Sequence, residues 1–162
     1  MNAIMLQYLI IFSGSFWFDR WTKNLAIRLL SQDAITVTSW LDFSLHWNRG
    51  ISFSWFAFDS TGGYIALTAV VAAVIVLFAI YTLGQYRSGK FLYGEMLVLA
   101  GALSNVVDRI KHGAVTDFID FHLGTWHFAT FNIADVCICF GITWIMLMQI
   151  KEVYDARVKN DR

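Results

Sequence analysis

The sequence predicts an all-α polytopic membrane protein with four transmembrane helices and a small β-sheet and loop region at the outer membrane surface. Of its 162 residues, 57% are hydrophobic and only 15% are charged, whereas soluble domains carry about 25% charged residues. Proline is absent, as expected of long uninterrupted helices. The seven Trp and six Tyr belong to the residue types that concentrate at membrane–water interfaces. The length predicts a single domain covering residues 1–162.

The first two predicted spans lie in the N-terminal half of the chain. Residues 3–18 are apolar apart from Gln7 and two Ser, and their helix can continue to residue 30 because nothing between Asp19 and Leu30 breaks it. Residues 63–83 contain no charged side chain. Their length matches the roughly 20 residues that cross a hydrocarbon core.

The other two predicted spans are residues 91–107 and 133–150. The third contains Glu95 and ends at Asp108, and the fourth begins beside Asp135 and ends at Lys151.

Basic residues predict the orientation of these spans. Six of the twelve Lys and Arg fall in the connection between the second and third spans or in the C-terminal tail: Arg87, Lys90, Lys151, Arg157, Lys159 and Arg162. Because such residues concentrate on the cytoplasmic side, both termini are expected in the cytoplasm. Residues 19–62 and 108–132 then lie on the outer side. The formal net charge of zero argues against nucleic acid as a partner.

The two outer connections have the composition of short strands. Residues 35–58 alternate loosely and are rich in β-branched and aromatic side chains, with a turn expected at Asn48-Arg49-Gly50. Residues 118–131 are similarly aromatic. We therefore expect a small sheet resting on the outer membrane surface.

Aspartates gather where the apolar segments end. Asp19, Asp108 and Asp135 each lie within a residue or two of the edge of an apolar run, and Asp117 and Asp120 lie between the last two. A charge beside a membrane-length segment is costly unless it is paired, hydrated or functional. Two such acids on one side of a bilayer can share a proton and activate a water, which indicates a membrane-embedded hydrolase. Spacing alone does not distinguish Asp117 from Asp120.

Helical spacing gives several of these residues a structural alternative. Asp19 precedes Lys23 by four residues, which favours a stabilising surface pair, although Lys23 can also meet an anionic lipid or backbone carbonyls at the rim. One face of the third span carries Gly101, Asn105, Asp108 and Arg109. Asp108 can pair there with Arg109 or with another segment and so anchor the helix at the interface.

Asn132 and Asp135 match the pattern of a helix start, with Asn at the N-cap and an acid at the third helical position. The same position suits chemistry, because a helix N-terminus stabilises a carboxylate. Spacing leaves both interpretations open.

Other catalytic chemistries find no support in the sequence. The four His have no zinc-ligand spacing, and there is no G-x-S-x-G motif. Cys137 and Cys139 are expected to be small apolar residues. No metal and no organic cofactor is therefore expected. The alternatives are a non-enzymatic membrane protein, such as a small transporter or assembly factor, and a membrane hydrolase of another chemistry.

Five sequence blocks, in order along the chain, carry a family resemblance. They are Asp19-Arg20-Trp21-Thr22-Lys23 (D-x-x-x-K), Asn48-Arg49-Gly50-Ile51-Ser52-Phe53 (N-x-G-x-[AS]-F), Gly101 to Arg109 (G-x-x-x-N-x-x-D-R), Gly113 to Phe118 (G-x-V-x-D-F) and Phe131 to Asp135 (F-N-x-A-D). Together with the four spans they resemble the lipoprotein signal peptidases, also called signal peptidase II. The match covers nearly the whole chain. It departs from the family at Val136, where Ser is common, and at Ala129-Thr130, near which Pro is common.

The resemblance implies a bacterial inner-membrane aspartic endopeptidase. Such enzymes remove the signal peptide of prolipoproteins on the N-terminal side of a Cys that carries diacylglycerol. The implied partners are diacylglyceryl-prolipoprotein substrates and membrane lipids, with the chain acting as a monomer and its active site on the extracytoplasmic side.

The resemblance also assigns roles to individual residues. The implied catalytic pair is Asp117 and Asp135, and Asp120 falls outside the motif. Support of the substrate and the pair is implied for Asn48, Gly50, Asn105, Arg109 and Asn132. The remaining motif residues are expected to be structural: Asp19, Lys23, Gly101 and Asp108.

Overall fold

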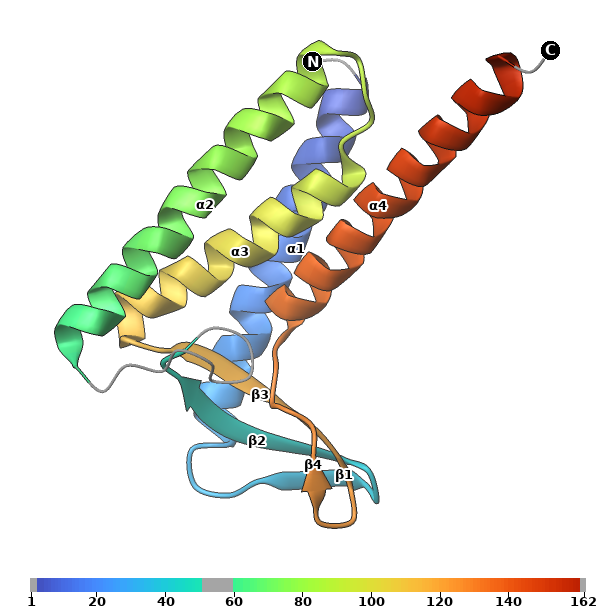
Figure 1. Ribbon diagram of the computed structural model, residues 1–162. Coiled ribbons are helices and arrows are strands. Elements are labelled where there is room, and N and C mark those ends of the chain that lie inside the picture. The colour runs from blue at the N-terminus through green and yellow to red at the C-terminus, as the bar shows by residue number, and fades with distance from the viewer. Residues whose placement is uncertain (1–2, 51–59, 161–162) are drawn as a thin grey trace.

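A computed structural model describes residues 3–50 and 60–160, which form four helices and a four-stranded sheet (Figure 1). The elements in chain order are α1 (Ala3–Leu29), β1 (Ile35–Thr38), β2 (Leu41–Asn48), α2 (Thr61–Arg87), α3 (Tyr93–His112), β3 (Val115–Leu123), β4 (Trp126–His127) and α4 (Ile133–Asn160). The sheet lies at one end of the helical bundle. The N-terminal end of α1 and the C-terminal end of α4 lie at the other end (Figure 1).

Each predicted span corresponds to a helix. The first continues through its charged part to Leu29, as expected, whereas the third begins at Tyr93 and the fourth extends to Asn160. Within the described ranges, two helices, α2 and α4, are long and apolar enough to cross a membrane. The many exposed apolar side chains of α2, such as Val70 and Leu77, suit a helix in contact with lipid.

The sheet is antiparallel, with strand order β1-β2-β3-β4. The hairpin turn between β1 and β2 falls at Ser39-Trp40, a turn that was not predicted from the sequence. The chain also turns after β2 at the predicted Asn48-Arg49-Gly50, where the Asn48 side chain accepts a hydrogen bond from the Gly50 amide at 2.9 Å. Such an Asx turn redirects the chain without pairing strands. The strand expected after Gly50 falls on residues 51–59, outside the described residues.

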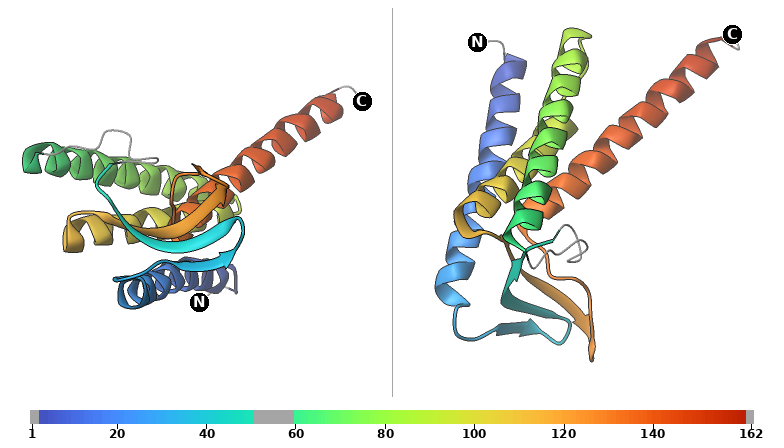
Figure 2. Two further views of the ribbon diagram at one scale, coloured as in Figure 1. Left: turned by 90° about the horizontal axis from the view of Figure 1, so that it is seen from below. Right: turned by 60° about the vertical axis from the view of Figure 1, so that its left-hand side comes forward.

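Small residues allow α3 and α4 to pack closely. A Cβ atom on Gly101 would lie 2.4 Å from the carbonyl oxygen of Ala134, and one on Gly141 would lie 2.6 Å from that of Gly94. The seam between the two helices is therefore formed by Gly94 and Gly101 of α3 and by Ala134 and Gly141 of α4. Small residues commonly allow membrane helices to approach closely. Toward its C-terminal end, α4 leans away from the other helices (Figures 1 and 2).

The sheet is attached to the bundle through the C-terminal end of α1. Ala26 and Leu30 form a small buried core with Phe118 of β3. Because the C-terminal end of α3 leads directly into β3, and α4 begins beside the same strand (Figure 1), polar residues from α1, α3, β3 and α4 meet at this junction.

Candidate active site

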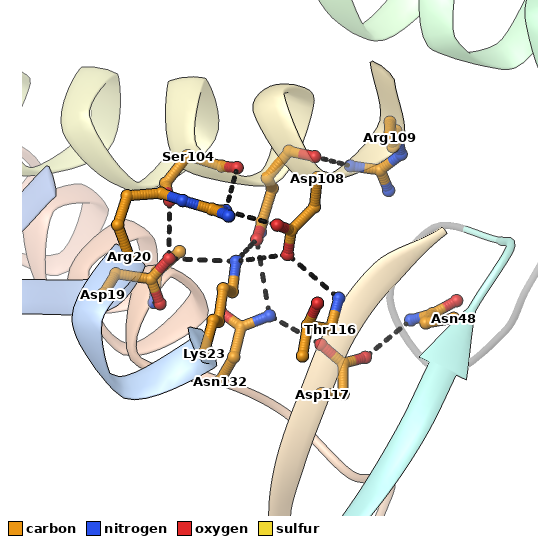
Figure 3. A network of polar contacts seen from close by, with 12 residues as sticks. Asp19, Arg20, Lys23, Asn48, Ser104, Asp108, Arg109, Thr116, Asp117 and Asn132 are labelled. Carbon is orange, nitrogen blue, oxygen red and sulfur yellow. Dashed lines mark hydrogen bonds and ion pairs between the residues drawn. The ribbon is translucent and has the colours of Figure 1, made fainter. Parts of the chain in front are cut away.

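A fully buried lysine holds the junction of helices and sheet together (Figure 3). The Lys23 ammonium lies 2.9 Å from Asp19 Oδ2 and 3.2 Å from Asp108 Oδ2, and it donates to Asn105 Oδ1 at 2.6 Å. All three charged side chains are 0% exposed. The expectation of a surface pair between Asp19 and Lys23 is therefore wrong, because α3 and α4 cover this face of α1.

Asp108 pairs with α1 rather than with its neighbour Arg109. Its Oδ1 atom forms an ion pair with Arg20, and its Oδ2 atom accepts the backbone N–H of Thr116 at 3.0 Å. Successive residues of a helix point roughly 100° apart, so Asp108 faces α1 while Arg109 faces away. Of the two alternatives that the sequence left open, the structure contains the pairing of Asp108 with another segment.

Asp19 connects α1 to the start of α4. Its Oδ1 atom accepts the backbone N–H of Ala134 at 2.7 Å, and its Oδ2 atom accepts the Ser104 hydroxyl at 2.6 Å. The Ala134 amide is one of the unpaired donors at a helix N-terminus, which an acid stabilises. One carboxylate thus fixes α4 against both α1 and α3.

Asn132 and Asp135 form a reciprocal cap at the start of α4. The Asp135 amide donates to Asn132 Oδ1 at 3.0 Å, and the Asn132 amide donates to Asp135 Oδ2 at 3.2 Å. This is the capping geometry that the spacing predicted. It fixes the direction of the Asp135 carboxylate and leaves the Asn132 Nδ2 group free to donate elsewhere.

Two asparagine amides link Asp135 to Asp117. Asn105 accepts from Lys23 through Oδ1, so its Nδ2 group donates, and it reaches Asp135 Oδ1 at 2.9 Å. Asn132 Nδ2 donates to Asp117 Oδ1 at 2.5 Å and also lies 3.3 Å from Asn105 Oδ1. Because an amide has one accepting and one donating end, Lys23 determines the orientation of the Asn105 amide.

Asp117 lies on β3 between two amide donors (Figure 3). Asn132 contacts its Oδ1 atom, and Asn48 Nδ2 donates to its Oδ2 atom at 2.9 Å. Asp117 is only 2% exposed. Burial, and after it the charge of Asp135, together raise the pKa of Asp117 to about 7, although the two amide donors oppose the shift. Asp117 therefore carries a proton for much of the time near neutral pH.

Arg109 and Gly50 hold the end of β2 beside the acids. The Arg109 guanidinium donates to the Gly50 carbonyl at 2.9 Å, and the Gly50 amide donates to Asn48 Oδ1 at 2.9 Å. The backbone carbonyl of Arg109 accepts the Tyr64 hydroxyl of α2 at 3.1 Å. These contacts hold Asn48 in place, and the Asn48 side chain donates a hydrogen bond to Asp117.

Both acids line one cavity of about 640 Å³ between α2, α3, α4 and the segment before α4. The site residues Asn48, Asn105 and Arg109 line it as well. Most of the remaining wall is apolar, including Val71, Ala102, Phe128, Phe131, Ile138 and Phe140. The cavity thus places two carboxylates at the wall of a largely apolar space.

Asp120 lies outside this arrangement. Its Oδ2 atom lies 2.9 Å from Nδ1 of His127, and Asp42 is its cross-strand neighbour. Three residues earlier on the same strand, Asp117 faces the cavity. This geometry distinguishes two acids that sequence spacing alone did not.

The sequence prediction did not assign roles to three residues of the network. Arg20 pairs with Asp108, Ser104 donates to Asp19, and the Thr116 amide donates to Asp108. Arg20 and Ser104 lie at variable positions inside the quoted motifs. Their roles follow from tertiary packing of α1 on α3, for which the sequence carries no local pattern.

Two solved structures share this fold. Both are described as bacterial membrane enzymes, determined in meso at 2.3 Å and 1.9 Å resolution. The first has a TM-score of 0.76 and 23% identity, covering 92% of this chain and 90% of its own; the second has a TM-score of 0.72 and 24% identity, covering 90% and 93%. The chain therefore has the fold of a membrane enzyme.

Sequence comparison identifies the family. The model of the family described as Signal peptidase (SPase) II matches residues 11–151. The lipoprotein signal peptidase of Coxiella burnetii (strain RSA 493 / Nine Mile phase I) is 39% identical over 127 residues, covering 76% of this chain and 77% of its own. That of Janthinobacterium sp. (strain Marseille) is 34% identical over 154 residues, covering 94% and 93%. The chain belongs to the signal peptidase II family and is a membrane peptidase that cleaves the signal peptides of prolipoproteins.

Proposed function

We propose that the chain is an aspartic endopeptidase in which Asp117 and Asp135 are the catalytic pair. One observation carries the proposal: carboxylates from β3 and α4 line the same cavity and are linked through Asn132, whose side chain donates to Asp117 and whose backbone amide donates to Asp135. Each of their four oxygens accepts a hydrogen bond, from Asn48 and Asn132 on Asp117 and from Asn105 and Asn132 on Asp135. Such a pair is held in place for chemistry rather than exposed as a solvated surface.

The two acids differ in environment, which supports different roles. Asp135 accepts a backbone amide at a helix N-terminus, where negative charge is stabilised. Asp117, whose pKa is raised to about 7 by burial and by the charge of Asp135, holds the proton of the pair. Because the two groups are coupled, the observed titration belongs to the pair.

In the proposed reaction, the Asp135 carboxylate takes a proton from a water molecule, whose oxygen attacks the scissile carbonyl carbon. Asp117 donates its proton to the carbonyl oxygen as the carbon–oxygen bond forms. Collapse of the tetrahedral intermediate breaks the carbon–nitrogen bond, and the proton held by Asp135 passes to the departing nitrogen. The substrate hydroxyl returns its proton to Asp117 as the new carboxyl group forms.

The surrounding polar residues are proposed to support the pair. Asn48, Asn105 and Asn132 orient the carboxylates, while Arg109 and Gly50 fix Asn48 at the end of β2. A structural role is proposed for Asp19, Lys23, Asp108 and Gly101, which join α1, α3 and α4.

We propose that all four helices span the bacterial inner membrane, with both termini in the cytoplasm and the sheet on the outer side. The two helix ends nearest the termini lie opposite the sheet (Figure 1), as four crossings require. The charges of α1 gather in its C-terminal half, where Asp19, Arg20 and Lys23 are buried against α3. The catalytic pair then lies near the outer boundary of the bilayer.

The proposed substrate is a diacylglyceryl-modified prolipoprotein, cut on the N-terminal side of the lipidated Cys. The apolar wall between α2 and α4 suits the lipid and the apolar part of a signal peptide, while the pair contacts the peptide bond. The monomer is proposed as the active unit.

The proposal is tested with the purified chain and a diacylglyceryl-modified prolipoprotein in the presence of EDTA. We expect full cleavage, and mass spectrometry should show a product that begins with the lipidated Cys. The same prolipoprotein without diacylglycerol should be cut poorly. Loss of cleavage in EDTA with recovery on metal addition, or a cut elsewhere, would contradict the proposal.

A further inference from the structure

A second cavity lies at the opposite end of the molecule from the catalytic pair. It has a volume of about 350 Å³ and is bounded by the last turns of α2, the connection to α3, the first turn of α3 and the C-terminal half of α4. These elements meet where α2 ends and α3 begins, on the side of the termini (Figure 1). Helix ends of this kind lie at the level of lipid headgroups in a membrane protein.

The cavity contains a buried carboxylate that lacks a complete set of partners. Glu95 lines the cavity and is only 5% exposed, and its Oε2 atom has no hydrogen-bond partner among the described residues. Glu95 lies in the first turn of α3, where the helix N-terminus stabilises its negative charge. An unpaired buried carboxylate nevertheless costs free energy, and a cationic ligand would reduce that cost.

Glu95 is the buried acid of this cavity, whereas the other charged residues that line it are exposed. Lys90, the nearest cation from the connection, is engaged by Glu152 at 2.6 Å in an exposed pair. Lys151 and Asp155 complete the charged lining. The cavity therefore offers a buried anion at its base and both signs of charge near its mouth, which fits a group carrying an ammonium and a phosphate.

A separate apolar groove adjoins this cavity at Trp144. It has a volume of about 440 Å³, is lined by residues of α1, α3 and α4, and shares Trp144 with the polar cavity. On the groove side, Leu97 and Phe140 provide apolar surface. A polar cavity and an apolar groove on either side of one Trp match the two parts of a phospholipid.

We propose that this cavity binds the ammonium headgroup of a zwitterionic phospholipid, with Glu95 as the contact for the ammonium group and an acyl chain in the apolar groove. The site lies apart from the catalytic pair and goes beyond the proposed function. A primary ammonium offers three donors to the free carboxylate oxygen, and its charge offsets that of Glu95.

The test compares phosphatidylethanolamine with phosphatidylglycerol, which share the phosphate and acyl chains and differ in the ammonium group. The full chain is placed in bilayers containing equal amounts of both, extracted in detergent, and the retained lipids are counted. We expect retention to favour phosphatidylethanolamine, and Glu95→Gln to lower the ratio of the two lipids about tenfold, which corresponds to about 1.4 kcal/mol. Glu95→Asp should retain an intermediate ratio.

Asp33→Asn is the matched control, because it removes one negative charge from an exposed position between α1 and β1. It should leave the lipid ratio unchanged. Prolipoprotein cleavage in detergent verifies that each variant is folded. Equal retention of both lipids by the unmodified chain would overturn the proposal. A lipid ratio that is the same in the Glu95→Gln variant would overturn it as well, because Glu95 would then not contact the ammonium group.

Discussion

At the scale of single residues, Lys23 is the charge on which the site's stability depends most. It is fully buried and lies beside two buried carboxylates, Asp19 and Asp108. Replacement by Met leaves both acids partly uncompensated, and breaking a buried pair costs about 3–5 kcal/mol. We therefore expect Lys23→Met to lower the free energy of unfolding by roughly that amount, measured by denaturant titration in detergent.

Lys90→Met is the control for this prediction, because Lys90 and Glu152 form an exposed pair. Its effect on stability should be small. The same structural role predicts that Asp19→Ala reduces folded yield or substrate handling more than the chemical step. A Lys23 or Asp19 variant that folds normally and binds substrate, yet has no turnover, would show that the role is catalytic instead.

The pH dependence of cleavage is the second prediction at this scale. The pKa of Asp117 is raised from 3.8 to about 7, so the folded protein loses this proton as the pH rises through about 7. The reaction needs that proton, and cleavage should therefore decline on the alkaline side around this pH. Asn48→Ala removes a donor that favours the ionised form, which raises the pKa further and should move the alkaline limb to higher pH.

Asp120→Asn is the control for the pH profile, since Asp120 contacts His127 and does not line the catalytic cavity. Its alkaline limb should coincide with that of the unmodified chain. An Asn48→Ala limb at the same or a lower pH would mean that a group other than Asp117 controls it.

Sequence patterns identified most of the site residues but not their partners. The cap formed by Asn132 and Asp135 followed from spacing, because both ends of that contact are local. The choice of Asp117 over Asp120 required the family resemblance. One partner of Asp108 is Arg20, 88 positions away in the chain, and no periodicity within one helix indicates such a contact.

At the scale of elements, the seam between α3 and α4 sets the position of Asp135, the proposed catalytic residue of α4. A Cβ atom on Gly101 would lie 2.4 Å from the Ala134 carbonyl oxygen, next to Asp135. We expect Gly101→Ala to push the start of α4 away, lowering both cleavage and the thermal midpoint. Helix propensity alone would predict the opposite effect on stability, because Ala is favoured over Gly in a helix by about 1 kcal/mol.

Gly14→Ala provides the comparison, because Gly14 is helical and nothing lies within 4 Å of the position its Cβ would take. That variant should be as stable as the unmodified chain or slightly more stable. Equal thermal midpoints for the Gly101 and Gly14 variants would contradict a close helix seam.

Apolar runs predicted the helices well, because a run without breakers has few alternatives. The extension of α1 to Leu29 followed from the absence of any breaker, although its charged part is stabilised by tertiary ion pairs. The hairpin turn at Ser39-Trp40 was not predicted, because it lacks Gly, Asn and Asp. The turn at Asn48-Arg49-Gly50 was predicted from its composition, but its contacts are tertiary: Asn48 accepts from the Gly50 amide and donates to Asp117.

At the scale of the whole molecule, the sheet and the proposed catalytic pair are expected to lie outside the cytoplasm. The C-terminal ends of α2 and α4, which carry Arg87, Arg157 and Lys159, lie away from the sheet (Figure 1), and basic residues concentrate on the cytoplasmic side. A reporter active only outside the cytoplasm should be active when fused after Asp59 and inactive when fused after Arg162. The reverse pattern would overturn the proposed orientation.

The catalytic pair is tested most directly by three conservative substitutions in one cleavage assay. Asp117→Asn and Asp135→Asn remove one acid each while keeping the side-chain shape, and each should lower turnover by at least about 10²–10⁴-fold in protein that remains folded and inserted. Asp120→Asn, on the same strand as Asp117 but outside the cavity, should remain substantially active. Turnover close to that of the unmodified chain in either Asp117→Asn or Asp135→Asn would contradict the assignment of the pair.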